Sequence, residues 1–209
     1  MEKLKFQSNW SDDNHCLQAC VKMVLDFVYN KDTSWDEVNK MTHFQEGLYS
    51  WMPAGAVAIN ERIPGVRLVS KLDYKEFSEK GEDYLIELWK NAPGWFAQQK
   101  RMASPDFSRE RNDAAYLLTH NIFECREISR SEIEKLLNEK IFVIALVNAD
   151  SLNDRDGSNA HFVLLYGQDE DNFILHDPGL PPIQAKHVDK NKFIDAFWQS
   201  VILVPSKKS

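Results

Sequence analysis

The sequence has few cysteines and fewer basic than acidic residues, and each feature argues against a class of protein. Its three cysteines are odd in number and too few for a disulfide framework, so we expect free thiols and a reducing compartment. Lysine and arginine total 25 against 32 acidic residues, which gives a net charge of −7. An acidic chain without a basic cluster argues against a nucleic-acid partner.

Long apolar runs are also missing. The longest, from Ile141 to Val147, has the length of a strand and is too short to span a membrane. The segment Met-Glu-Lys-Leu-Lys-Phe-Gln at the start has no apolar core of an export signal, so we expect a cytoplasmic protein without a membrane partner. At 209 residues, without repeats or low-complexity segments, the chain is predicted to form a single domain over residues 1–209.

Helical patterns dominate the first part of the chain. Ser34 and Glu37 form a capping box ahead of a short helix, and Pro53 can open the next one. Residues 73–121 predict two to four helices and no strand. We interpret this stretch either as a helical insertion that forms one wall of a cleft or as the helical half of the same domain.

Strand patterns dominate the second part. Strands are predicted over 122–128, 141–148, 161–167, 172–177 and 201–204, with helices over 129–140 and 189–198. Helices first and a mainly antiparallel sheet afterwards predict an α+β protein, with an N-terminal helical part packed on the sheet.

Cys16 stands where a polar loop meets an apolar helical pattern. Asp12, Asp13 and Asn14 precede it and are of residue types that cap helices. Apolar residues then recur at spacings of three and four, which predicts one buried helix face that includes Cys20. A thiol in the first helical turn lies at the positive end of the helix dipole, which favours the nucleophilic thiolate. Cys16 is therefore a candidate nucleophile, the alternative being a small buried hydrophobic residue.

His161 and Asp177 form a second candidate pair. The strand-like runs 161–167 and 172–177 predict a β-hairpin. A turn centred near Asp169 places His161 directly opposite Asp177, and side chains in such cross-strand pairs lie about 5 Å apart. Asp177 can then accept the imidazole N–H and leave the other ring nitrogen to face a thiol. The alternative is a structural His–Asp pair with no catalytic role.

The order and separation of these residues are typical of papain-type enzymes. The pattern comprises Cys16 with Cys20, Met23 and Leu25 behind it, Ala160-His161-Phe162-Val163 leading to Gly167, and His176-Asp177-Pro178. On these residues the sequence resembles the papain-like cysteine peptidases that process bacteriocins at double-glycine leaders, and their stand-alone relatives. The resemblance covers about the first third and the last two fifths of the chain.

The resemblance implies a papain-like fold and a cysteine-dependent hydrolase that cleaves a peptide or amide bond. By it, Cys16 would be the nucleophile, His161 the base, Asp177 the orienting acid and Gln7 the oxyanion donor. The thiolate attacks a carbonyl to form a thioester, which water resolves. Such an enzyme needs a peptide or protein substrate and no metal or organic cofactor.

The oxyanion donor has alternatives within the sequence. Gln7 is the only glutamine ahead of Cys16, and its side-chain amide would act together with the backbone N–H of Cys16. Asn9 and Asn14 are the other candidate donors. Trp51, Trp89 and Trp95 are candidates to line a substrate cleft, with a role in the core as the alternative for each.

Three rival functions remain open at this point. The first is a catalytically inactive peptide-binding module of the same fold, and the second is a deamidase or acyltransferase that uses the same triad. The third is a zinc site in which His15 or Asp177 joins Cys16, Cys20 and His161, although the paired C-x-x-C signature of such sites is absent. We expect His15 to be a surface or loop residue instead.

Overall fold

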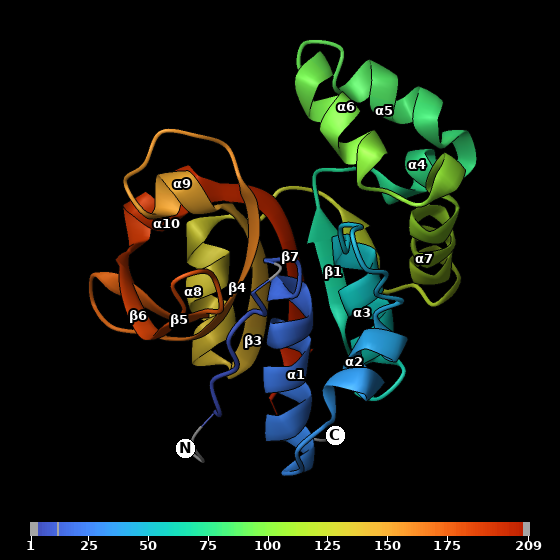
Figure 1. The fold of residues 1–209 in the computed structure, drawn as a ribbon. Coiled ribbons are helices and arrows are strands. Elements are labelled where there is room, and N and C mark those ends of the chain that lie inside the picture. The colour runs from blue at the N-terminus through green and yellow to red at the C-terminus, as the bar shows by residue number, and fades with distance from the viewer. Residues whose placement is uncertain (1–3, 12, 207–209) are drawn as a thin grey trace.

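A seven-stranded sheet forms the centre of the computed structural model, which describes residues 4–11 and 13–206 (Figure 1). In this part of the chain the strand order is β2-β1-β7-β3-β4-β5-β6, and every neighbouring pair is antiparallel except the parallel pair of β1 and β2. The strands are β1 Arg67–Ser70, β2 Phe123–Cys125, β3 Ile141–Asn148, β4 Ala160–Gln168, β5 Asn172–Asp177, β6 Ile183–Asp189 and β7 Phe197–Pro205.

Ten α-helices and one 3-10 helix surround the sheet over the described residues, and several begin where the sequence predicts. The side chains of Ser34, Asp73, Ser129 and Asp189 each accept a backbone N–H at the start of a helix. The helices are α1 Cys16–Tyr29, α2 Trp35–Met41, α3 Met52–Asn60, α4 Tyr74–Lys80, α5 Glu82–Leu88, α6 Pro93–Arg101, η1 Pro105–Phe107, α7 Ser108–Thr119, α8 Arg130–Asn138, α9 Ala149–Leu152 and α10 Lys190–Ala196.

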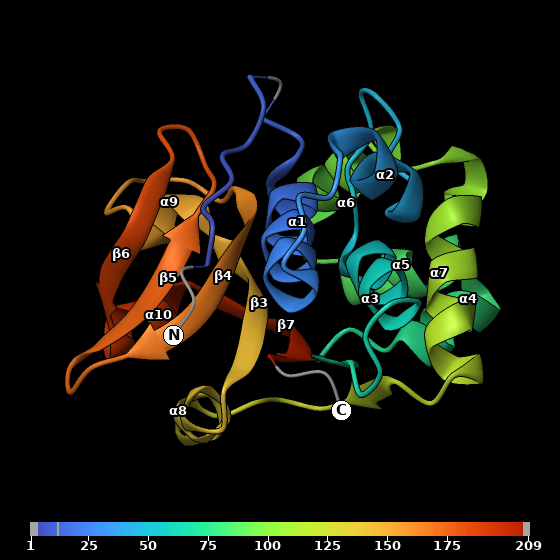
Figure 2. The same ribbon diagram turned by 90° about the horizontal axis from the view of Figure 1, so that it is seen from below.

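The sheet carries a hydrophobic core on each face. Strand β4 shows the division, because Phe162 and Leu164 belong to one core cluster while Val163 and Leu165 belong to the other. Figure 2 shows α1 and α8 on opposite faces of the sheet, as this alternation requires. The protein is therefore α+β with a mainly antiparallel sheet, as predicted.

Residues 73–121 fold into helices α4 to α7 with η1, and contain no strand, as predicted. Figure 1 shows α4, α5 and α6 stacked together beyond β1, at the end of the molecule remote from β5 and β6. Helix α7 packs on both α3 and α4 and so ties these helices to the rest of the fold.

The start of α1 differs from the predicted cap. His15 occupies the N-cap position and makes no side-chain capping hydrogen bond. The preceding loop is held instead by Asn9, whose Oδ1 accepts the N–H of His15 at 2.7 Å and that of Trp10 at 2.9 Å. Asn9 also donates from Nδ2 to Asp13. The predicted cap residue Asp12 lies outside the described residues.

His15 was predicted to be a surface or loop residue; it lies in the loop ahead of α1, but it is buried and not at the surface. Only 1% of the residue is exposed, and its ring stacks on Trp10 and packs against Phe44. Trp35 is the third aromatic neighbour that encloses the imidazole. The sequence shows His15 only as one polar residue and does not reveal this enclosure. Among the described residues, no helix combines the length and apolarity needed to cross a membrane.

Candidate active site

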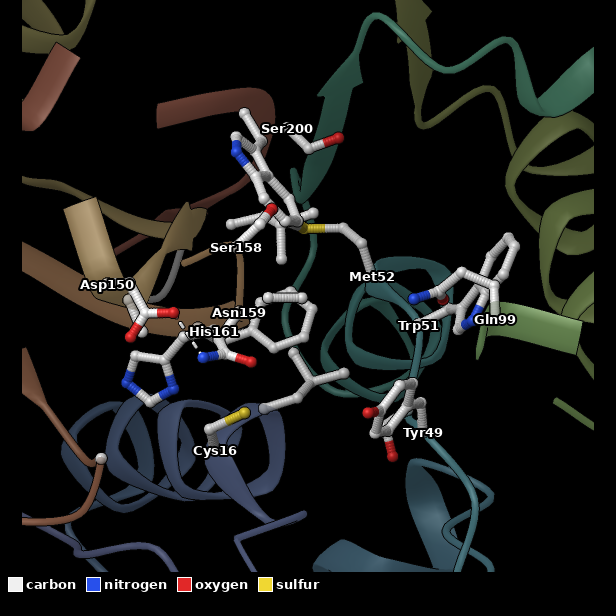
Figure 3. Close-up of a pocket in the computed structure, with 18 of the residues that line it drawn as sticks. Cys16, Tyr49, Trp51, Met52, Gln99, Asp150, Ser158, Asn159, His161 and Ser200 are labelled. Atoms are coloured by element: carbon white, nitrogen blue, oxygen red, sulfur yellow. Dashed lines mark hydrogen bonds between the residues drawn. The ribbon is translucent and has the colours of Figure 1, made fainter. Parts of the chain in front are cut away.

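A cavity of about 1240 Å³ opens between the start of α1, the start of β4, the end of β5, and helices α5 and α6. Cys16 and His161 both line it, together with Asp177 at the end of β5. Figure 3 shows Cys16 and His161 next to each other at one side of the cavity, with Trp51 and Gln99 across from them. Predicted site residues from distant parts of the sequence therefore meet in one space.

Cys16 is the first residue of α1 and is half-buried. The first-turn amides of a helix carry partial positive charge, and the first turn of α1 contains no acidic residue to offset it. One turn later, Cys20 is fully buried in the core, and burial raises the pKa of its thiol, with a further contribution from the charges of Cys16 and Asp177. Of these two thiols only Cys16 lines the cavity.

His161 lies near the start of β4 and is bound to Asp177. Its Nε2 lies 2.8 Å from Oδ1 of Asp177, and both side chains are less than 10% exposed, at 8% and 4%. The structure therefore brings together the pair predicted from the hairpin, with the second ring nitrogen left for a partner on the other side.

The register that predicted this contact is wrong, although the contact forms. Leu164 pairs with His176 and Leu165 with Leu175, so that Asp177 is diagonal to His161 across the ladder and not directly opposite. Two features move the register. The turn closes between Asp169 and Asn172, and a bulge between Leu165 and Gly167 adds one residue to β4.

Asp177 is held by donors on both carboxylate oxygens. Oδ1 accepts the backbone N–H of Gly179 at 3.1 Å in addition to His161, and Oδ2 accepts Nζ of Lys186 at 2.9 Å. Burial favours the neutral acid, but the hydrogen bond from His161 and the cation of Lys186 outweigh it and hold the pKa of Asp177 well below its usual range. Asp177 is thus a fixed carboxylate.

Contacts with its neighbours likewise keep His161 charged at neutral pH. Burial disfavours its cationic form, yet hydrogen bonds with Asp177 and with Cys16 outweigh the burial and raise the pKa of His161 to about 10. An imidazolium beside a cysteine stabilises the thiolate form of that cysteine. The geometry can therefore support a thiolate–imidazolium pair with Asp177 behind it.

The loop that leads into His161 is fixed by a network that the sequence did not reveal. Asn148 accepts the N–H of Asp150 and of Asn159, while its amide donates to the carbonyl of Gly157. The side chain of Asn159 donates to the buried carboxylate of Asp150, and Figure 3 shows this bond beside His161. The sequence offers only a polar stretch, 153–159, between two predicted strands as a signal of this loop.

The predicted oxyanion donor is not brought into the cavity. Gln7 is half-buried and is not among the described residues that line this space. Asn9 is buried and engaged with the loop before α1. Asn14, the remaining candidate, lines the cavity two residues ahead of Cys16.

Tryptophans form the opposite side of the cavity. Trp51, Trp89 and Trp95 all line it, as predicted for cleft residues, and Trp198 at the start of β7 joins them. We call Trp89, Trp95 and Trp198 the aromatic wall. Trp95 contacts Trp89 and Trp198 edge to face, with ring centroids 6.3 and 5.2 Å apart. The sequence did not indicate Trp198, which is distant from the other tryptophans along the chain.

The zinc alternative finds no arrangement to support it in the described ranges. Within residues 4–11 and 13–206, no group of three or more His, Cys, Asp and Glu side chains could hold a metal ion. Cys20 faces the core, and His15 packs among aromatic rings.

The α+β fold is papain-like. It is similar to the crystal structure of the peptidase domain of Streptococcus ComA, a bi-functional ABC transporter involved in a quorum sensing pathway, with a TM-score of 0.51 and 13% sequence identity. The similarity covers 97% of this chain and 99% of that domain. At this identity the likeness concerns the fold.

A separate comparison, with models of protein families, gives a match over part of the chain. Residues 115–209 match the model of the Peptidase C39 family, so the predicted resemblance to the bacteriocin-processing cysteine peptidases is confirmed. The matched region contains His161 and Asp177, whereas Cys16 lies outside it. The match supports cysteine peptidase activity. No curated protein matches the chain by sequence.

Proposed function

We propose that the protein is a cysteine peptidase in which Cys16 is the nucleophile, His161 the general acid and base, and Asp177 the residue that orients the imidazole. The observation that carries this proposal is the buried bond between His161 and Asp177, at 2.8 Å, with Cys16 on the other side of the same imidazole. A structural His–Asp pair needs no cysteine at its free nitrogen and no cavity beside it.

The reaction follows from these positions. The Cys16 thiolate attacks the carbonyl carbon of a peptide bond, and the tetrahedral oxyanion that forms lies near the positive end of α1. Collapse breaks the C–N bond as the His161 imidazolium gives its proton to the leaving amine, which leaves a thioester on Cys16. Neutral His161 then takes a proton from water, and the hydroxide releases the acid and restores the thiolate.

The cavity favours peptides with large apolar side chains. Its far side is formed by the aromatic wall, and Leu88, Leu180 and Ile183 at its edge are all exposed apolar residues. Two cationic side chains of the lining are already paired, Lys71 with Glu127 and Arg155 with Asp150. Burial of an apolar side chain against such walls contributes about 1.5–3 kcal/mol to binding.

Alkylation of the thiols tests the proposal without a known substrate. Iodoacetamide is added at about pH 6, where an ordinary thiol is almost wholly protonated, and the labelled peptides are identified by mass spectrometry. Cys125 is an exposed thiol outside the cavity and serves as the internal control. We expect Cys16 to be labelled at least about tenfold faster than Cys125, and the difference to shrink in His161→Gln.

Equal labelling of Cys16 and Cys125 in the folded protein would contradict the proposal. Peptide cleavage is then measured with a mixed peptide library, in which hydrolysis produces two fragments whose masses sum to the substrate plus water. Loss of this cleavage in Cys16→Ala, and not in Cys125→Ala, identifies Cys16 as the nucleophile.

A further inference from the structure

Lys186 contacts the same carboxylate that holds His161. Its Nζ donates to Oδ2 of Asp177 at 2.9 Å and to Oδ1 of Asn153 at 2.7 Å. The side chain is only 14% exposed. The imidazole of His161 binds the other carboxylate oxygen, Oδ1. Two nitrogen groups that can carry positive charge therefore share one buried carboxylate from its two sides.

The position of Lys186 depends on an irregularity in β6. The register of β5 and β6 shifts between Leu175, which pairs with Lys186, and Asp177, which pairs with Ile183. Ala185 lies in this irregular segment with φ of +52°, a left-handed conformation that a residue with a side chain adopts at a cost. A bulge of this kind re-aims the side chains beside it, here Lys186.

A buried histidine stabilises the irregular segment. The backbone N–H of Ala185 donates to Nδ1 of His176 at 3.1 Å. The ring of His176 is 2% exposed and packs against Phe6 and Tyr166, which fix its orientation. The surrounding contacts thus hold Ala185 in its strained conformation, as is usual for strained backbone near functional sites.

A cation behind Asp177 changes what the carboxylate does for His161. Alone, a buried carboxylate would hold the imidazolium so firmly that its proton would transfer poorly to a leaving amine. A second cation on the same carboxylate weakens this hold, because like charges repel and the field acts through a site with little water. The same contact prevents the carboxylate from rotating away from the imidazole.

We propose that Lys186 is a positioning residue of the active site, which fixes the carboxylate of Asp177 and limits how tightly His161 holds its proton. This inference rests on the proposed function, in which His161 must both take a proton and give it up. Lys186 itself touches neither substrate nor the reacting atoms.

An NMR titration tests the inference directly. The imidazole Cε1–H signal of His161 is followed against pH and assigned among the six histidines by its loss in His161→Gln. The titration is made in the Cys16→Ala background, where the interactions with Cys16 that raise the pKa of His161 are absent and the midpoint is easier to reach. We expect Lys186→Met to raise the midpoint by about one unit and Lys186→Arg to return it close to the Lys186 value.

Controls separate this effect from a loss of structure. Lys192 forms an ion pair with Asp154 at the surface, and Lys192→Met should leave the midpoint unchanged. A merely structural Lys186 would lower the melting temperature without moving the midpoint. If Lys186→Met fails to fold, Lys186→Gln carries the test, because it keeps a polar donor but no charge beside Asp177 and should also raise the midpoint.

An unmoved or lowered midpoint in folded Lys186→Met, or in folded Lys186→Gln where Lys186→Met does not fold, overturns the inference. That result would leave the alkylation of Cys16, on which the proposed function depends, unaffected. Slow alkylation of Cys16 would instead overturn the proposed function, whatever the titration shows.

Discussion

Gly179 approaches His161 so closely that a side chain at residue 179 would contact the imidazole. A Cβ built on Gly179 lies 3.2 Å from Nε2 of His161 and 3.0 Å from Oδ1 of Asp177. The backbone N–H of Gly179 meanwhile donates to that same oxygen. The absence of a side chain at residue 179 therefore permits its backbone N–H to reach Asp177 beside His161.

Gly179→Ala should impair the site more than the fold. The added methyl group displaces Asp177 or His161 by a few tenths of an ångström, and we expect the alkylation rate of Cys16 to fall roughly tenfold. Gly94→Ala is the matched control, because no atom lies within 4 Å of a Cβ placed there. An alkylation rate that is the same in both variants would refute this reading of Gly179.

Alanine substitutions of Cys16 and Cys20 should have different effects, the first on activity and the second on stability. Cys16→Ala should abolish alkylation at that site and peptide cleavage, with the urea midpoint nearly unchanged, because its side chain lies at the edge of the core. Cys20→Ala removes a fully buried atom and should lower the free energy of unfolding by about 1–2 kcal/mol. Urea denaturation and cleavage assays on both variants check this, and equal inactivation by both folded variants would oppose the assignment.

Asp177→Asn should lower the rate and move its pH range. The amide removes the charge that raises the pKa of His161, so the imidazolium loses its proton at lower pH. We expect the alkaline limit of activity to fall, with the rate reduced at least about tenfold. Asp169→Asn is the control, because Asp169 contacts His187 at 3.0 Å on the exposed hairpin turn and should have no such effect.

The pKa of His161 also predicts how stability depends on pH. Its folded-state value of about 10 exceeds the ordinary 6.5, so protonation favours the folded state. The stabilisation is complete below about pH 6.5 and is lost as pH rises toward 10. Urea titrations between these values should show a decline in unfolding free energy that His161→Gln lacks, and parallel curves for the two proteins would contradict the prediction.

Trp95→Ala should weaken substrate binding more than catalysis. It removes the centre of the aromatic wall, and we expect KM for peptides with large apolar side chains to rise roughly tenfold while kcat changes little. Trp35→Ala is the matched control, because Trp35 is half-buried beside Trp10 and does not line the cavity. An equal change in KM in both variants would exclude a subsite at the aromatic wall.

Local signals in the sequence predicted most of the fold. The hydrogen bonds of Ser34, Asp73 and Ser129 at helix starts each join residues two or three apart, so the sequence alone contains the whole interaction. The contact of His161 with Asp177 was also predicted, because the strand period of two keeps both residues on one face.

Features that depend on tertiary structure were not predictable in this way. The bulge between Leu165 and Gly167 in β4 altered the register. Lys186 reaches Asp177 only through the irregular backbone at Ala185, and Trp198 reaches Trp95 only when β7 joins the sheet. Strand β6 was missed because its exposed residues alternate too weakly to give a period.

The place of β7 in the sheet has a consequence for the order of assembly. This strand is the last of the described chain, yet it lies between β1 and β3 and bonds to both. Until Phe197–Pro205 has left the ribosome, the strands on either side of it have no partner along those edges. Unpaired edges of this kind attract other chains, so the sheet can close safely only after β7 has been synthesised.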